Sequence, residues 1–333
     1  MKNIKRINLE IWPTPIHKLS RFGQLIGNEN TYIKRDDISL TGLGGNKLRK
    51  LEYWLGEARS REATKIVVAG GEQSNLVRLT AAACAKSGFD CIAIHNCKRP
   101  ARFQGNMLLN KLFGAEQIFI GDVTEGERDL FVKDKISQLT KIGEVPYCIN
   151  NEEIGSLGYT NCLYEIDNQS PDTKHLVIVG AMGITASGFI FANRVLKNKY
   201  TIHVISVEYE KEKLIKILAK KLLFLEGNAL EDVSWLKFDK SDLEKQYNSY
   251  VYDDYMGKGW GITTEESLQT IREMAQLEGI LLDHVYNAKT FTGLKGLVAN
   301  GVIKNGEKTC IVHTGGAPAI FGHAEIYQDL DNS

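Results

Sequence analysis

Hydrophobic positions follow two alternating patterns along the chain. Short apolar runs rich in Val and Ile, such as residues 65–69 and 175–179, are typical of strands buried on both faces of a parallel sheet. Between them, longer stretches space their apolar residues three and four apart, which predicts amphipathic helices. This alternation predicts an α/β fold with mostly parallel sheets. The expected strands are residues 31–34, 65–69, 91–95, 117–120, 175–179, 201–207 and 309–313, and the expected helices are 46–59, 74–86, 103–112, 184–196 and 264–278.

Three expected strands run directly into glycine-containing loops. The loops begin at Gly70-Gly71, at Gly180 and at Thr314-Gly315-Gly316. Ligands of open α/β sheets bind at the carboxyl ends of the strands. We therefore expect these loops to contribute to one composite site.

Composition and charge exclude several classes of function. The 333 residues are 43% hydrophobic and 25% charged, which is ordinary for a globular protein of two lobes or one large domain. The 41 basic and 41 acidic residues cancel, which argues against nucleic acid as a partner. No apolar run reaches the roughly 20 residues of a membrane span, and the N-terminus lacks a signal-peptide core. We expect a cytoplasmic protein without a membrane partner.

The six cysteines form no C-x-x-C pair, and no histidines cluster beside them. This spacing predicts neither a metal site nor a disulfide framework, so the cysteines are interpreted as small buried hydrophobic residues.

Two charged stretches stand out. Residues 210–226 interleave lysines with apolar residues, which predicts a solvated amphipathic helix or, alternatively, a helix on a membrane surface. Residues 231–245 are charged and expected at the surface.

Lys47 opens an expected helix directly after Gly44-Gly45-Asn46. The spacing of a phosphate-binding P-loop is missing. A lysine is slightly unfavourable in a first turn, because the helix N-terminus carries partial positive charge. Lys47 is therefore either a surface lysine or an amine of low pKa suited to Schiff-base chemistry, and the segment alone supports both.

Two other helix starts could bind a ligand. Ser74 and Asn75 offer a hydroxyl and an amide, although Ser74 could equally be a plain N-cap. Residues 180–188, GAMGITASG, follow a buried strand, so backbone N–H groups there could bind a phosphate. The glycine spacing differs from the dinucleotide fingerprint, which disfavours a nicotinamide enzyme.

Taken together, these segments and their neighbours resemble one family, the D-cysteine desulfhydrases and 1-aminocyclopropane-1-carboxylate deaminases, which are pyridoxal-phosphate enzymes. The matching motifs occur in the family's order from residue 13 to residue 321 and therefore cover nearly the whole chain. They are PTPI at 13–16, KRDD at 34–37, GGNK at 44–47, RKLE at 49–52, QSN at 73–75, GN at 105–106, EGIL at 278–281 with Tyr286, and HTGG at 313–316.

The resemblance implies a fold. It predicts the type II fold of pyridoxal-phosphate enzymes, with two three-layer α/β lobes, mostly parallel sheets and the cofactor in the cleft between the lobes. The small domain is expected at residues 51–158 and the large domain at 1–50 plus 159–333. The resemblance also implies a homodimer.

It further implies the residues that hold the cofactor. Lys47 would bind pyridoxal 5′-phosphate covalently and later move a proton. Asn75 would hydrogen-bond the ring oxygen, and Thr314 would meet the pyridine nitrogen. The turn of Gly183, Ile184 and Thr185 would bind the phosphate, with Lys50 as a weaker candidate.

The remaining roles concern a small amino acid substrate. Ser74 would lie beside its carboxylate or reacting carbon, and Tyr286 would face it. Trp260 lies in a glycine loop where the family usually has a tyrosine. Tryptophan has no phenolic oxygen and can only donate a hydrogen bond, so we expect a different substrate pocket.

The residue after Tyr286 favours one branch of the family. Deaminases have a glutamate there, which favours a protonated ring nitrogen, whereas this chain has Asn287. A neutral hydroxyl partner such as Thr314 gives a weaker electron sink, which suits β-elimination. The predicted reaction is α,β-elimination from a β-substituted amino acid, giving pyruvate, ammonia and a leaving group such as sulfide.

Three alternatives stay open beside this reading. One is 1-aminocyclopropane-1-carboxylate deamination. Another is β-elimination or β-replacement on a different amino acid in a specialised pathway. The third is a catalytically dead ligand-binding protein on the same fold, against which the presence of Lys47, Ser74 and Tyr286 argues.

Overall fold

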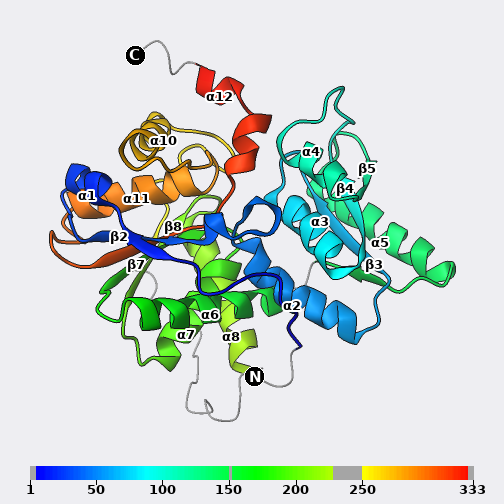
Figure 1. Cartoon of the computed structure of the whole chain (residues 1–333), viewed down its shortest axis with the longest axis horizontal. Helices are drawn as coiled ribbons and strands as arrows, with labels where there is room; N and C mark the ends of the chain where they lie inside the picture. The colour runs from blue at the N-terminus through cyan, green and yellow to red at the C-terminus, as the bar shows by residue number, and fades with distance from the viewer. Residues whose placement is uncertain (1–4, 150–151, 228–249, 329–333) are drawn as a thin grey trace. The chain divides into compact units, whose positions relative to one another are not determined.

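The computed structural model describes residues 5–149, 152–227 and 250–328, so the charged stretch 231–245 lies outside the described residues. By its contacts the chain divides into two compact units (Figure 1). Of the described residues, the larger unit comprises Trp12–Ile38 and Gly155–Gly315, and the smaller unit takes those of Ile4–Ile11, Ser39–Ile154 and Gly316–Ser333.

The domain limits expected from the sequence, 51–158 for the small domain and 1–50 plus 159–333 for the large one, stay a prediction. The smaller unit defined by contacts has different limits. It also contains the described residues of Ile4–Ile11, residues 39–50 and the described chain from Gly316 onward, and its central segment ends at Ile154.

A six-stranded sheet forms the centre of the larger unit, in the order β1-β2-β10-β7-β8-β9. All neighbouring strands are parallel except β1 and β2, which are antiparallel. Ile311 of β10 lies opposite Ile33 of β2 and Val177 of β7, which places it in the middle of the apolar core. The strands are β1 (Ile16–Lys18), β2 (Thr31–Arg35), β7 (His175–Gly180), β8 (Thr201–Ser206), β9 (Val251–Tyr252) and β10 (Thr309–His313).

Helices cover both faces of this sheet, so the larger unit has three layers (Figure 1). One face carries α1, α10 and α11, and the other carries α6, α7 and α8. At Gly293 of α11 a Cβ atom would lie 2.7 Å from Ile205, so glycine allows the helix to lie close against β8. The helices are α1 (Ser20–Ile26), α6 (Glu152–Gln169), α7 (Ile184–Val195), α8 (Lys211–Gly227), α10 (Glu265–Glu278) and α11 (Asn287–Ala299), with a short 3-10 helix, η1 (Asp36–Ile38).

The lysine-rich helix expected at 210–226 is α8, and its apolar face lies inside the fold. Leu214, Leu218 and Leu222 are buried, and α8 contacts α7. Among the described residues no helix has the length and apolar content needed to span a bilayer.

The smaller unit is built on a parallel four-stranded sheet in the order β5-β4-β3-β6. Val67, Ile92 and Ile94 pack with Val132 and Leu139 of α5 in an apolar cluster. Alternate residues of a strand point to opposite faces, so the other face is left to α3, which contacts β3 and β4. The strands are β3 (Lys65–Gly70), β4 (Asp90–His95), β5 (Glu116–Phe119) and β6 (Pro146–Cys148).

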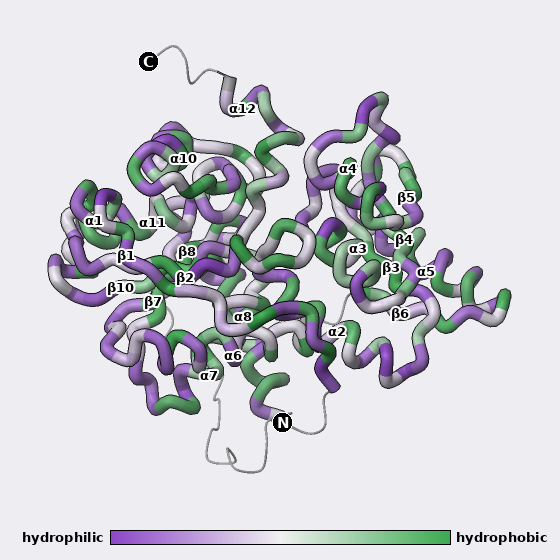
Figure 2. Tube along the Cα trace, in the orientation of Figure 1, coloured by the Kyte–Doolittle hydropathy of each residue, from purple (hydrophilic) through white to green (hydrophobic). Residues whose placement is uncertain are grey.

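The helices of the smaller unit connect and cover these strands. They are α2 (Lys47–Ser60), α3 (Asn75–Ser87), α4 (Gly105–Leu112), α5 (Glu125–Lys141) and α12 (Glu325–Gln328), with the 3-10 helices η2 (Thr41–Leu43) and η4 (Ala317–Gly322). In Figure 2 the hydrophobic colour concentrates on strands such as β3 and β4, as expected for strands covered on both faces. The prediction of an α/β fold with mostly parallel sheets is confirmed.

Candidate active site

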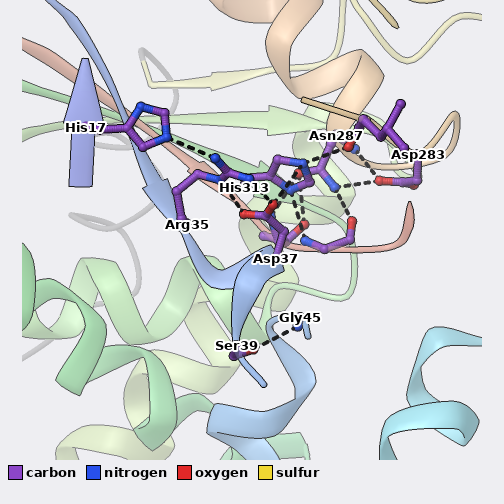
Figure 3. Close-up of polar contacts among 11 residues, drawn as sticks. His17, Arg35, Asp37, Ser39, Gly45, Asp283, Asn287 and His313 are labelled. Atoms are coloured by element: carbon purple, nitrogen blue, oxygen red, sulfur yellow. Dashed lines mark hydrogen bonds and ion pairs between the residues drawn. The ribbon is translucent and has the colours of Figure 1, made fainter. Parts of the chain in front are cut away.

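Lys47 is the first residue of α2 and is half-buried. The chain reaches it through Gly44 and Gly45, whose φ angles of 68° and 134° lie in the region that favours glycine. The backbone N–H of Gly45 donates to Ser39 Oγ at 3.1 Å (Figure 3). The glycines of the GGNK motif are therefore required by the turn that leads to the lysine.

Arg78 of α3 holds the same turn from the other side. Its guanidinium donates to the carbonyl of Gly42 and to the carbonyl of Gly44, the latter at 3.1 Å. Burial lowers the pKa of Arg78 to about 10. This buried cation connects the turn before Lys47 to α3, a role that the sequence did not predict.

Ser74 and Asn75 begin α3 directly after the carboxyl end of β3. Ser74 is an N-cap, because its hydroxyl oxygen accepts from the backbone N–H of Val77 at 3.3 Å. Asn75 Oδ1 accepts from Asn106 Nδ2 at 3.0 Å, and the same Nδ2 donates to the carbonyl of Gln73 at 2.7 Å. Asn106 thus orients the amide of Asn75 so that its Nδ2 is available as a donor.

Lys50 lies one turn after Lys47 on α2, and the two are therefore neighbours on the helix surface. Lys50 is buried, with 6% of its surface exposed. In the smaller unit the structure thus places four predicted site residues at two helix starts that Arg78 connects: Lys47, Lys50, Ser74 and Asn75.

The turn at Gly183, Ile184 and Thr185 lies between β7 and α7 of the larger unit. Gly183 is the N-cap of α7 with a φ of 76°, and a Cβ there would lie 3.0 Å from Ile217. The first backbone N–H groups of a helix have no partner inside it and attract anions. The turn has the backbone geometry of an anion site, and its side chains at 184 and 185 are buried.

Tyr286 and Trp260 contact each other directly. Trp260 Nε1 donates to the Tyr286 hydroxyl at 3.2 Å, although the two residues lie 26 positions apart. Tyr286 is the N-cap of α11, and its backbone N–H donates to Asp283 Oδ2 at 2.8 Å.

The loop of Trp260 is held by Lys289, which is fully buried. Its Nζ donates to the carbonyls of Met256 and Gly259, both at 2.7 Å. Burial lowers the pKa of Lys289. A buried ammonium bonded to backbone carbonyls was not expected from the sequence, and its position three residues after Tyr286 offered no signal for this role.

Thr314 follows β10, the strand next to β7, so its position is at the same edge of the sheet as the Gly183 turn. Its backbone N–H donates to Asn287 Oδ1 at 2.9 Å, and its hydroxyl donates to the same oxygen at 3.2 Å. The structure thus links Thr314 to Asn287, the neighbour of Tyr286, through contacts that the sequence did not predict (Figure 3).

His313 fixes this strand end through both of its ring nitrogens. His313 Nδ1 accepts from the backbone N–H of Gly315 at 3.1 Å, and its Nε2 lies 3.0 Å from the carbonyl of Leu281. This arrangement is satisfied by a neutral imidazole protonated on Nε2. Figure 3 also shows Arg35 paired with Asp37, whose carboxylate lies 3.9 Å from His313 Nε2.

Each unit by itself offers groups of the kind that the cofactor implied by the resemblance needs. A phosphate needs backbone donors, which the glycine cradle at Gly183 provides, and a carbonyl needs an amine, which Lys47 provides. A heteroaromatic ring needs directed partners, and Asn75 and Thr314 are both oriented by an asparagine.

Comparison with known proteins supports this interpretation over nearly the full chain. The chain is 32% identical to a D-cysteine desulfhydrase of Serratia proteamaculans over 333 residues, with 96% of each chain covered. It is 33% identical to a D-cysteine desulfhydrase of Yersinia enterocolitica, again with 96% of each chain covered. A crystal structure of an ACC deaminase homologue matches with a TM-score of 0.84 and 31% identity, covering 98% of this chain and 97% of that one.

The model of one protein family matches most of the chain. It is described as "Pyridoxal-phosphate dependent enzyme" and matches residues 7–315. The resemblance stated from the motifs is confirmed, together with the type II fold and the cofactor it implies. The chain belongs to the family of pyridoxal-phosphate dependent enzymes.

Proposed function

We propose that this enzyme catalyses α,β-elimination from a β-substituted amino acid, with D-cysteine as the first candidate substrate. D-cysteine and water would give pyruvate, ammonia and hydrogen sulfide. The observation that carries the proposal is that Asn287 occupies the position at which the deaminases have a glutamate. Its amide is hydrogen-bonded to Asp283, Thr314 and Gly315, so position 287 holds a neutral amide in place of a carboxylate, beside the neutral hydroxyl of Thr314.

The proposed cofactor site uses the residues predicted from the sequence. Lys47 would bind pyridoxal phosphate, the Gly183–Thr185 turn and Lys50 would bind its phosphate, Asn75 its ring oxygen and Thr314 its pyridine nitrogen. When bound, the cofactor supplies an electron sink beside the α-carbon.

The chain's own groups would orient the substrate and move its protons. Ser74 lies at the N-terminus of α3, where the partial positive charge favours the substrate carboxylate. Lys47 Nζ would accept the α-proton once the substrate amine has replaced it. Tyr286 would face the reacting carbon atoms, with its hydroxyl held by Trp260.

We further propose that the enzyme is a cytoplasmic homodimer whose partner is a small amino acid and not a nucleic acid or a membrane. The balanced charge supports the absence of a nucleic-acid partner. The six cysteines, all of which are free thiols, support a cytoplasmic location. The assembly is tested by the molar mass in solution from light scattering.

Product analysis tests the reaction. Holoenzyme is incubated with D-cysteine and 1-aminocyclopropane-1-carboxylate together, and the oxo acid is identified by mass spectrometry. We expect pyruvate and sulfide with D-cysteine, and no product with Lys47→Ala. Formation of 2-oxobutanoate without pyruvate would overturn the proposal and assign the deaminase reaction.

Trp260 favours a second candidate within the same chemistry. Its indole is larger than the tyrosine usual at this position, and 55% of Trp260 is exposed. A pocket bordered by this side chain could select another β-substituted amino acid. The test is the same pyruvate assay with β-chloroalanine and O-acetylserine of both configurations. A substrate that exceeds D-cysteine in kcat/KM would favour this candidate.

A further inference from the structure

Asn287 is a buried amide that joins three segments of the larger unit (Figure 3). Only 1% of its surface is exposed. Its Nδ2 donates to Asp283 Oδ1 at 2.5 Å and to the carbonyl of Gly315 at 2.6 Å. Its Oδ1 accepts from the backbone N–H of Thr314 at 2.9 Å and from the Thr314 hydroxyl at 3.2 Å. Both hydrogens and both lone pairs of the amide are therefore used.

The partners determine the orientation of this amide. The backbone N–H of Thr314 can only donate, so the atom that faces it is the oxygen. The Gly315 carbonyl and the Asp283 carboxylate face the nitrogen. The Thr314 hydroxyl is consequently the donor in its contact with Asn287, since Oδ1 has no hydrogen to give.

Asp283 fixes Asn287 in turn. One carboxylate oxygen accepts from the backbone N–H of Asn287 at 3.0 Å, and the other accepts from Tyr286 N at 2.8 Å and Val285 N at 3.1 Å. These contacts hold the start of α11 rigidly, because four donors converge on one carboxylate. Asn287 is thus a fixed acceptor for the Thr314 hydroxyl.

We propose that Asn287 is a positioning residue for the cofactor's pyridine nitrogen, and that it acts through Thr314 by competing for the proton of the Thr314 hydroxyl. This inference rests on the proposed function, in which Thr314 meets that nitrogen. Asn287 itself has no donor or acceptor left for a cofactor. It controls how much of the Thr314 proton is available to the ring, and hence how strong an electron sink the ring becomes.

The same geometry explains why a carboxylate does not suit this position. A glutamate or aspartate at 287 would place a second negative group beside Asp283 and would lose the donor to Gly315. Like charges at this distance disfavour ionisation of both groups. The chain therefore combines a neutral residue at 287 with a hydroxyl at 314.

The test is the ¹⁵N NMR resonance of the pyridine nitrogen in enzyme loaded with ¹⁵N-labelled pyridoxal phosphate. This resonance reports hydrogen bonding and protonation of the nitrogen and needs no turnover. The variants are N287L, which removes the acceptor with little change in shape, T314V, which removes the hydroxyl, and the double variant. T290V is the matched control, because Thr290 is also buried on α11 and its hydroxyl donates to the carbonyl of Tyr286.

We expect N287L to shift the resonance when Thr314 is present and to leave it unchanged in the T314V background. The control T290V should leave the resonance where it is in the unsubstituted enzyme. An equal shift in both backgrounds, or no shift with Thr314 present, would overturn the inference alone. If N287L does not hold the cofactor, N287A replaces it in the same comparison.

A different result would overturn the site as well. If T314V leaves the resonance where it is in the unsubstituted enzyme, Thr314 does not meet the pyridine nitrogen, and both the assignment of Thr314 and the role of Asn287 fail. The D-cysteine assay is independent of this readout, so failure of the proposed reaction is recognised separately.

Discussion

The indole nitrogen of Trp260 donates a hydrogen bond to the hydroxyl of Tyr286, and the two atoms lie 3.2 Å apart. An indole can donate but not accept, so the direction of this bond is fixed. The Tyr286 oxygen is therefore the acceptor in this bond. A tyrosine at position 260 could either donate to Tyr286 or accept from it. Tryptophan restricts Tyr286 to the role of acceptor toward residue 260, so the phenolic proton is not used in this bond.

Removal of this bond should slow the elimination. In Trp260→Phe we expect kcat with D-cysteine to fall about tenfold, equivalent to ~1.4 kcal/mol, because one hydrogen bond is lost to the tyrosine that we propose faces the substrate. Steady-state kinetics measure the loss, and absorption of the bound cofactor reports whether the site is loaded. Trp260→Tyr, which restores a donor, should recover most of the rate. Equal rates for Trp260→Phe and the unsubstituted enzyme would show that the bond has no part in turnover.

Lys289 should stabilise the loop that carries Trp260. In Lys289→Met the carbonyls of Met256 and Gly259 lose their donor, so we expect the free energy of unfolding to fall by ~1–3 kcal/mol. The loop should also become looser, and acrylamide should quench Trp260 fluorescence more strongly. The chain has four tryptophans, so Trp260→Phe with and without the Lys289 substitution provides the background signal. Unchanged quenching would show that Lys289 does not hold the loop of Trp260 in place.

Much of the fold can be read from the sequence where strands are buried on both faces. The expected strands at 65–69, 175–179 and 309–313 correspond to β3, β7 and β10 within one residue. The sequence analysis did not predict α5, because only Val132 and Leu139 of its 17 residues are buried and its apolar periodicity is weak. The short strands β1 and β9 were also missed, since two or three residues are too few to show a period.

Some residues of the candidate site can be predicted from local sequence, and others depend on contacts that form only in the folded chain. Residues such as Lys47 and Ser74 are recognisable because they stand at helix starts after glycines, which is local information. The partnership of Asn287 with Thr314 spans 27 residues and exists only once β10 lies beside α11. Asp283 could have been found, because an aspartate in a turn often accepts from the backbone N–H two residues on, as it does here from Val285.

Asn106 should control cofactor affinity through Asn75. In Asn106→Ala, Asn75 Oδ1 loses its donor, so its amide can rotate away from the ring oxygen that we expect it to bind. We expect the dissociation constant of pyridoxal phosphate to rise about tenfold, equivalent to ~1.4 kcal/mol, in equilibrium dialysis against apoenzyme.

Asn110→Ala is the matched control for this measurement. Asn110 is also buried on α4, one turn after Asn106, with 1% of its surface exposed, and its side-chain oxygen has no partner among the described residues. Both substitutions should lower stability, but only Asn106→Ala should weaken cofactor binding. Equal loss of affinity in the two variants would mean that α4 acts by packing alone.

A buried chain of hydrogen bonds makes the larger unit sensitive to acid. Tyr252 lies 3.2 Å from His203 Nδ1, His203 Nε2 lies 3.0 Å from His175 Nδ1, and His175 Nε2 lies 3.0 Å from Glu307. Two neutral imidazoles satisfy every link, with the hydroxyl and each ring N–H donating toward Glu307. A proton added to His175 Nδ1 would place a donor against a donor between the two histidines, and a proton added to His203 Nδ1 would oppose the hydroxyl proton of Tyr252.

The pKa values of this chain give the direction of the effect. Burial and the neighbouring His175 lower the pKa of His203 to about 3, and burial lowers the pKa of His175. Lys174, the Lys304 backbone and His175 lower the pKa of Glu307. The unfolded chain therefore binds more protons than the folded chain below pH ~6.5, so stability is present at neutral pH and is lost as the pH falls toward 3.

We expect the free energy of unfolding to fall by ~2–4 kcal/mol between pH 7 and pH 4 because of these histidines. Urea denaturation at a series of pH values measures this slope. In His203→Gln the amide can still accept from Tyr252 and donate to His175 but does not titrate, so the slope should flatten. His17 is exposed and hydrogen-bonded to Arg35, so His17→Gln should leave the slope unchanged. If His203→Gln retains the full slope, the acid sensitivity arises from other groups, because the link between Tyr252 and His175 would then be intact without a titrating imidazole.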